Sequence, residues 1–161
     1  MLQVQMEIPN IHSHVPTHYP FMLGSLFVIM GKKIAYNPST LPDPSGRYSH
    51  IVKANSQNLL FIAGQVSLDK GGNIVGRGDF RAQVEQVFLN LKFALEAGGA
   101  SFDDLVKINV YTTDIEKYRE FGTSVRNKYI TKEPPTSTLL GISSLAHPDL
   151  LLEIEGIAVI D

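Results

Sequence analysis

The C-terminal segment, residues 150–160, places the strongest constraint on what this chain can fold into. It consists of leucine, isoleucine and valine, broken only by Glu153, Glu155, Gly156 and Ala158. A run that is apolar at nearly every position is typical of a strand covered on both faces. Side chains alternate between the faces of a strand, so the two glutamates share one face. Because charged side chains are seldom fully buried without a partner, that face opens into a cleft or an interface, or the glutamates lie in solvent near the strand's edge.

Four further strands are predicted upstream of this segment. Alternating apolar residues bounded by turn residues predict strands over residues 50–54, 59–63, 106–111 and 137–141. The polar residues 55–58 separate the first two strands. This short connection predicts that these two strands pair as a β-hairpin.

Two helices are predicted between the strands. The first begins at Asp79, a good N-cap, and ends at the glycine pair 98–99. Its polar face is expected in solvent and comprises Arg81, Glu85, Asn90, Lys92 and Glu96. The second helix is expected to begin with a capping box over residues 113–116 and to end before Pro134 and Pro135.

The order of these elements, β-β-α-β-α-β-β, predicts an α+β fold. Two helices can cover one face of a mixed sheet. The C-terminal strand is apolar on both of its faces, so the face of the sheet away from the helices must also be covered. No third helix is predicted, and we expect another copy of the chain to cover it.

Composition narrows the function classes. The chain has 161 residues and no cysteine, which excludes disulfides and thiolate chemistry and fits a cytoplasmic protein. Its net charge is -2 and it has no basic block, so nucleic-acid binding is not expected. The apolar run over residues 20–30 is too short to span a bilayer, and we expect no membrane partner.

Residues 1–30 differ in character from the rest and are expected to be an N-terminal extension of unknown role, with a single domain over residues 31–161. His14 and His18 have the spacing of two zinc ligands on a helix. However, Pro16 lies between them and no third ligand is evident, so no metal site is expected. No cofactor is expected either.

Several short segments resemble one known family. They are residues 46–49 (GRYS), 61–65 (FIAGQ), 90–91 (NL) followed by 96–99 (EAGG), 106–111 (VKINVY) and 153–158 (EIEGIA). In this order they resemble the Rid family (YjgF-type, also described as endoribonuclease L-PSP-like), over residues 36–160. The resemblance implies a chorismate-mutase-like α+β fold and a homotrimer with a central barrel. It also implies clefts between subunits that bind small carboxylates. The best-known members hydrolyse enamines and imines to ketones and ammonia, and some are described as endoribonucleases or translation inhibitors.

One departure from the family concerns substrate binding. In deaminating members an arginine in a Pro-x-Arg-Ser turn clamps the substrate carboxylate, and Thr136 stands at that position here. A guanidinium makes two charge-assisted hydrogen bonds to a carboxylate, whereas a hydroxyl makes neutral ones. The replacement is expected to cost about 2 kcal/mol or more in anion binding.

The resemblance assigns the candidate site residues. Glu153 matches the glutamate that orients the hydrolytic water and is the predicted catalytic residue. The predicted substrate-binding residues are Tyr48, Gly64, Thr136 and Ser137. Two other family positions differ, since Ala63 replaces a serine and Gly122 replaces a cleft asparagine.

Each assignment has a structural alternative. Tyr48 could be a packing residue, Glu153 could form an ion pair across an interface, and the hydroxyls of Thr136 and Ser137 could satisfy backbone groups in the turn. The sequence therefore predicts a hydrolase or deaminase acting on a small enamine, imine or related C–N substrate. A non-catalytic metabolite-binding trimer is the alternative, and a ribonuclease or translation inhibitor is less supported.

Overall fold

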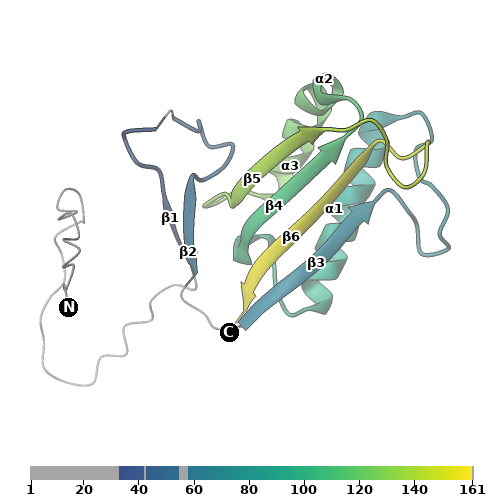
Figure 1. The fold of residues 1–161 in the computed structure, drawn as a ribbon. Helices are drawn as coiled ribbons and strands as arrows, with labels where there is room; N and C mark the ends of the chain where they lie inside the picture. Colours follow the sequence, from purple (N-terminus) through teal and green to yellow (C-terminus); the bar gives the residue numbers. More distant parts are fainter. Residues whose placement is uncertain (1–32, 42, 55–57, 161) are drawn as a thin grey trace, which may run out of the picture.

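The computed structural model describes residues 33–41, 43–54 and 58–160. Its centre is a four-stranded mixed sheet with the order β3-β6-β4-β5 (Figure 1). The strands are β3 (Asn58–Val66), β4 (Leu105–Thr112), β5 (Thr136–Gly141) and β6 (Leu152–Ile160). Strand β6 runs antiparallel to both β3 and β4, while β4 and β5 are parallel. The predicted α+β class is therefore confirmed as a mixed sheet with helices.

The predicted hairpin between the second and third strands is wrong. Strand β2 (Ile51–Ala54) pairs antiparallel with β1 (Lys33–Tyr36) in a separate two-stranded sheet. Strand β3 pairs with β6, and the paired residues lie between 87 positions (Val66 and Glu153) and 102 positions (Asn58 and Ile160) apart in the sequence. The nine-residue apolar strand β3 is stabilised by more cross-strand side-chain pairs when it pairs with the nine-residue β6 than with a four-residue strand. The turn residues next to β3 in the sequence do not reveal that distant partner.

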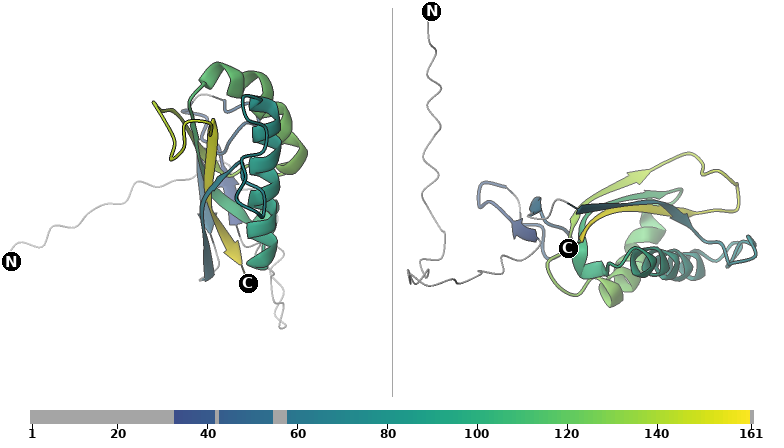
Figure 2. Two further views of the ribbon diagram at one scale, coloured as in Figure 1. Left: turned by 90° about the vertical axis from the view of Figure 1, so that its right-hand side faces the viewer. Right: turned by 90° about the horizontal axis from the view of Figure 1, so that it is seen from below.

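Helix α1 (Phe80–Ala97) lies along β3 and β6 on one face of the sheet (Figure 2). As predicted, Asp79 is its N-cap, and the carboxylate accepts a hydrogen bond from the Ala82 N–H. The buried core residues of α1 are Phe80, Val84, Val87, Phe88, Leu91 and Leu95. They pack with the helix-facing residues of the sheet, which include Ile108, Val110, Leu152 and Ile154.

The second predicted helix consists of three consecutive pieces. These are α2 (Ile115–Lys117), one turn of π-helix, η2 (Tyr118–Gly122), and α3 (Thr123–Tyr129). The predicted capping box over residues 113–116 is wrong, because the N-cap is Asp114, whose carboxylate accepts a hydrogen bond from the Lys117 N–H. The Thr113 N–H is not available for capping, since it donates to Leu151 O. A short 3₁₀ turn, η1 (Phe102–Asp104), precedes β4.

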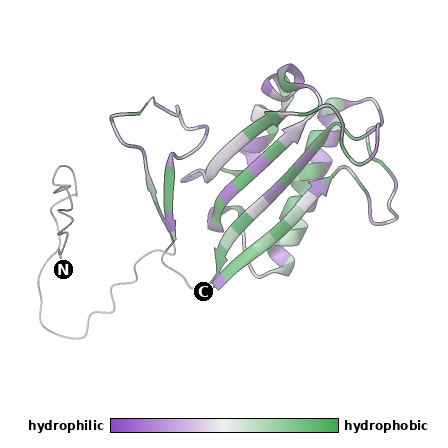
Figure 3. Cartoon of the chain, viewed as in Figure 1, coloured by the Kyte–Doolittle hydropathy of each residue, from purple (hydrophilic) through white to green (hydrophobic). Residues whose placement is uncertain are grey.

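Strand β6 alternates between its two faces as predicted. Leu152 and Ile154 are fully buried towards the helices, while Glu153 and Glu155 are half-buried on the opposite face. No helix of the described part of the chain covers that opposite face, here called the open face (Figures 2 and 3). Phe61, on the neighbouring strand β3, is 70% exposed there. The open face is thus partly apolar and uncovered within one chain.

The predicted N-terminal extension, with His14 and His18, lies outside the described residues, and the division at residue 30 stays a prediction. None of the helices in the described ranges is long and apolar enough to cross a membrane.

Candidate functional site

Glu155 is held by its neighbours on the open face. Its Oε1 accepts hydrogen bonds from Asn109 Nδ2 at 2.7 Å and from the Tyr111 hydroxyl at 2.8 Å. These two bonds lower the pKa of Glu155, and the bond to Glu155 raises the pKa of Tyr111. Asn109 lies directly across from Glu155 in the ladder between β4 and β6. The carboxylate of Glu155 therefore links two strands.

Glu153, the predicted catalytic residue, is in a different situation. Its carboxylate makes no hydrogen bond with any other residue in the described ranges. It lies against Gly64, where a Cβ atom would overlap Glu153 Oε1. The register between β3 and β6 shifts between Ile62 and Gln65, so Gly64 belongs to a β-bulge. Such bulges redirect side chains and take backbone groups out of the paired ladder.

A groove of about 480 Å³ opens at Glu153 and Gly64. The loops before α1 and before β6 complete it, with Ile74 and Arg77 from the first loop and His147 from the second. Arg77 is ion-paired with Asp149, and His147 Nδ1 accepts a hydrogen bond from the Asp149 N–H at 3.1 Å. In this groove the carboxylate of Glu153 has no hydrogen bond within the described residues, whereas Arg77 and His147 already have partners.

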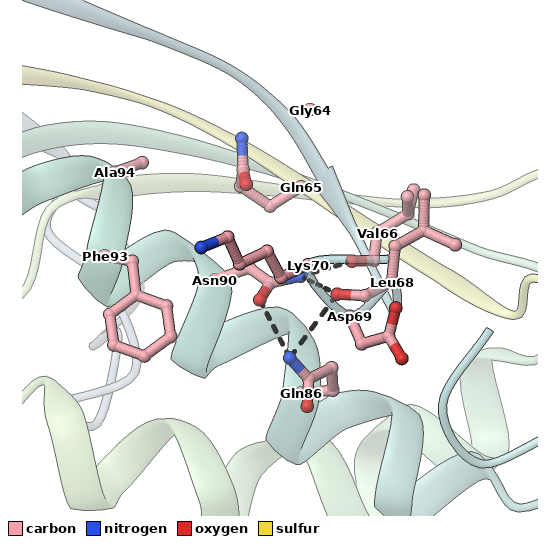
Figure 4. Close-up of a pocket in the computed structure, with 10 residues that line it drawn as sticks. All are labelled: Gly64, Gln65, Val66, Leu68, Asp69, Lys70, Gln86, Asn90, Phe93 and Ala94. Carbon is pink, nitrogen blue, oxygen red and sulfur yellow. Dashed lines mark hydrogen bonds between the residues drawn. The ribbon is translucent and has the colours of Figure 1, made fainter. Parts of the chain in front are cut away.

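A second cleft, of about 700 Å³, lies between the end of β3 and α1 (Figure 4). Asn90 Nδ2 donates to Val66 O at 2.9 Å and to Leu68 O at 2.8 Å, and Gln86 Nε2 donates to Asn90 Oδ1 at 2.8 Å. The expectation that Asn90 lies on a solvent-facing polar surface is therefore wrong. The signal in the sequence was the amide side chain of Asn90 among apolar helix residues, because asparagine favours hydrogen bonds to backbone groups. These bonds fix the segment that follows Gly64.

Tyr48 and Ser137 meet elsewhere, in a pocket of about 310 Å³ beside β5. Ser49 holds the Tyr48 loop in place, because its hydroxyl donates to Pro134 O at 2.5 Å and its N–H donates to Pro135 O at 3.1 Å. Tyr48 is half-buried.

The same pocket contains Arg126, which sequence reasoning missed. Its side chain comes from α3, and the residue is only 6% exposed. Burial lowers the pKa of this guanidinium. The signal that the sequence offers is its position one residue after Val125 and four after Gly122, both of which are also buried.

Thr136 and Ser137 do not act together, because neighbouring strand residues point to opposite faces. Ser137 faces the helices with Leu139, whereas the Thr136 hydroxyl donates to Val106 O at 2.9 Å across the parallel ladder. The Thr136 hydroxyl thus satisfies a backbone group, which was the structural alternative for this residue.

The five predicted site residues therefore do not form one site within one chain, and Thr136 lines neither of the two pockets that hold the others. Gly64 and Glu153 share one groove, whereas Tyr48 and Ser137 share another pocket. No group of three or more histidine, aspartate or glutamate side chains in the described ranges could hold a metal ion.

Comparisons with known proteins identify the family. Residues 39–160 match the family model described as endoribonuclease L-PSP. A RutC family protein of Pyrococcus horikoshii is 41% identical over 73% of this chain and 90% of its own length. A 2-iminobutanoate/2-iminopropanoate deaminase of Dermatophagoides farinae is 29% identical over 81% of this chain and 98% of its own length.

A solved structure agrees with these matches. The Rid family protein YyfB of Yersinia pestis superposes with a TM-score of 0.75 and 32% identity, over 81% of this chain and 100% of that chain. The chain belongs to the Rid family (YjgF-type), whose matching model is described as endoribonuclease L-PSP.

Proposed function

We propose that this protein is a Rid-type hydrolase that acts on a small enamine, imine or related C–N substrate. The related protein of Dermatophagoides farinae is named as a deaminase of two such imino acids, which supports this reaction class. The proposed reaction adds water to a C=N bond and releases a ketone and ammonia.

The observation that carries the proposal is the contrast between two glutamates on one face. Glu155 is engaged by Asn109 and Tyr111, whereas Glu153 has a carboxylate without a hydrogen bond in the described residues and faces a groove. A carboxylate in this position can take a proton from water as the water attacks the imine carbon. Returning that proton to nitrogen completes the carbinolamine. The same group can then transfer the proton of the carbinolamine hydroxyl to nitrogen, so that the C–N bond breaks, the C=O bond of the ketone forms and ammonia leaves.

We further propose that the working site forms between two subunits of a homotrimer with a central barrel. The open face is uncovered within one chain, and it exposes Leu59, Phe61 and Leu140 by 49%, 70% and 46%. Apolar side chains gathered on an uncovered face favour association. In this arrangement the groove of Glu153 on one subunit receives Tyr48 of the next subunit. A cytoplasmic location stays a prediction.

A second candidate function is non-catalytic metabolite binding by the same trimer. It is favoured by Thr136, which stands where deaminating members have an arginine and whose hydroxyl is engaged by Val106 O. The ribonuclease role has less support, because Arg77, the arginine of the groove, is neutralised by Asp149.

Hydrolysis of a freshly generated imino acid tests the proposal. An amino-acid oxidase can supply 2-iminopropanoate, and release of pyruvate can be followed in the presence of semicarbazide as a competing trap. We expect turnover that is slow relative to an arginine-bearing relative but above the uncatalysed rate. A rate equal to the uncatalysed one for imino acids and for uncharged imines would leave metabolite binding as the function.

A further inference from the structure

The groove at Glu153 includes an apolar part that the proposed chemistry does not use. Its lining side chains are Val66, Leu68, Ile74 and Leu150. Leu150 is buried, whereas the other three are half-buried and present apolar surface to the groove. A ligand with an apolar group would remove this surface from water, which is favourable.

The first wall of this apolar part is a short hairpin over residues 67–75. Leu68 and Ile74 lie opposite each other in an antiparallel bridge. Residues directly opposite each other in such a pair point to the same side, and both line the groove. On either side of them, the Ser67 hydroxyl donates to Val75 O at 2.7 Å, and the Val75 N–H donates to Ser67 O at 3.0 Å. These bonds hold the two apolar side chains next to each other.

The tip of the same hairpin is also held by hydrogen bonds. The Asp69 carboxylate accepts hydrogen bonds from the N–H of Gly71 at 2.8 Å and of Asn73 at 2.9 Å. The Asp69 N–H donates to Asn73 O at 2.9 Å. Because the wall is already ordered, a ligand that binds to it loses little free energy to the ordering of a loop.

The loop before β6 forms the second wall, at the end of the sheet where β3 ends and β6 begins (Figure 1). Gln83 of α1 is fully buried, and its Nε2 donates to Gly76 O at 3.1 Å and to Asp149 O at 2.7 Å. Its Oε1 accepts a hydrogen bond from the Leu151 N–H at 2.9 Å. The ion pair of Arg77 with Asp149 joins the same two loops again. Gln83 and this ion pair therefore hold the two walls at a fixed distance from each other.

We infer that this apolar part of the groove binds the side chain of the substrate, and that the preferred substrate carries a branched aliphatic side chain. The inference rests on the proposed function and deepens it, because it places the C=N carbon beside Glu153 and the side chain against Leu68 and Ile74. These aliphatic walls favour methyl and methylene groups and offer no partner to a charged group. The groove volume of about 480 Å³ lies in the range of pockets that hold ligands much larger than a three-carbon acid.

Calorimetric titration of the full-length protein with three 2-oxo acids tests this subsite. Pyruvate, 4-methyl-2-oxopentanoate and 2-oxoglutarate share the 2-oxo acid group, so differences in affinity report the side chain. We expect 4-methyl-2-oxopentanoate to bind at least about tenfold more tightly than pyruvate, because even one methylene group in an apolar pocket changes affinity by about tenfold or more. The acid 2-oxoglutarate should bind no more tightly than pyruvate, because its second carboxylate would lose water without gaining a partner.

Two variants in the same hairpin locate the subsite. Ile74→Ala should weaken binding of 4-methyl-2-oxopentanoate by about tenfold and leave pyruvate affinity unchanged, because it removes apolar contacts that only the longer side chain makes. Val75→Ala is the matched control, since Val75 is also half-buried but does not line the groove. It should leave both affinities unchanged. Thermal melts check that both variants are folded.

Four results would overturn the inference: no binding of 4-methyl-2-oxopentanoate at millimolar concentration, equal binding of pyruvate, tighter binding of 2-oxoglutarate, or the same affinities in Ile74→Ala as in Val75→Ala. If Ile74→Ala does not fold, the ranking of the three acids by the wild-type protein decides. Absence of hydrolysis for every imino acid would refute the proposed function and leave the measured side-chain preference standing. Equal binding of the three acids together with hydrolysis would refute the subsite alone.

Discussion

The carboxylate of Glu153 lies directly against the α-carbon of Gly64, so that any side chain at position 64 would overlap Glu153 Oε1. The two residues come from neighbouring antiparallel strands, and the bulge in β3 brings them together. The glycine of the Gly-Gln segment therefore leaves room for the glutamate carboxylate in this position. This relationship connects two residues that the sequence assigned separately.

Gly64→Ala should reduce hydrolysis more than it reduces stability. The overlapping atom is the end of a flexible side chain, which can move aside at little cost, but the moved carboxylate no longer faces the groove. A change in melting temperature of only a few degrees is expected, about the effect of 1 kcal/mol. Gly141→Ala is a matched control, because its Cβ would contact the flexible Ile115 side chain at 2.8 Å, and Ile115 is absent from the groove. Equal activity in the two variants would contradict the prediction.

Glu153→Gln should remove most of the hydrolytic activity and keep the oligomer. General-base assistance contributes ~10²–10⁴-fold, so the loss is measurable even in a slow enzyme. If Glu153 instead forms an ion pair across an interface, the same substitution weakens the proposed trimer, at a cost of about 3–5 kcal/mol for a buried pair. Light scattering and activity measured on one sample separate the two roles. A variant that stays trimeric and fully active would refute both.

Glu155→Gln should affect stability at acid pH and spare catalysis. The pKa of Glu155 is lowered by hydrogen bonds from Asn109 and Tyr111, so it contributes stability that is present above its ordinary value of 4.5 and is lost as pH falls through the lowered folded value. Melting temperatures between about pH 3 and 6, the range around carboxyl pKa values, should therefore decline less steeply in the variant. If the melting temperature falls with pH as steeply in the variant as in the wild type, these hydrogen bonds contribute nothing to stability.

Thr136→Arg should increase affinity for small carboxylates such as 2-oxobutyrate on the open face. Replacing a neutral hydroxyl by a guanidinium gains about 1–2 kcal/mol, or roughly tenfold in affinity. Thr136→Gln is the control, because it also gives up the bond to Val106 O but adds no charge. If calorimetry gives the same affinity for both variants, the residue at position 136 is not aligned with a carboxylate.

Local signals in the sequence predicted the elements better than their pairing. Asp79 and the alternation along β6 are properties of short segments, and the structure confirms both. The hairpin of β2 with β3 was wrong because pairing depends on the whole set of strands, and β6 lies far away in the sequence. Asn90 was misplaced for a related reason, since its partners Val66 O and Leu68 O belong to another element.

The sequence predicted candidate site residues, but it did not predict which of them lie together in the structure. Strand alternation alone separates Thr136 from Ser137, because neighbouring residues of a strand point to opposite faces. The burial of Arg126 and its unpartnered Nη2 depend on three-dimensional packing, which the sequence around position 126 does not reveal. Whether Glu153 and Tyr48 meet depends on where a second copy of the chain lies. No pattern within one sequence gives the position of that copy.

Mixing two inactive variants tests whether one site uses two subunits. Glu153→Gln and Tyr48→Ala should each be inactive as homotrimers, since each lacks one half of the proposed site. After subunits are exchanged by mild denaturation and refolding at equal amounts, a site has both native residues when Glu153 and Tyr48 come from adjacent chains of different type. Random assembly then restores about a quarter of wild-type activity, because a closed ring repeats the same contact at every interface.

A mixture of wild type with the double variant is the control: it also gives about a quarter of wild-type activity if the site spans two chains, but about a half if one chain contains the whole site. Light scattering on the same samples checks the trimer. No recovery in the first mixture together with half activity in the second would place the entire site within one subunit, and the open face would then have another role.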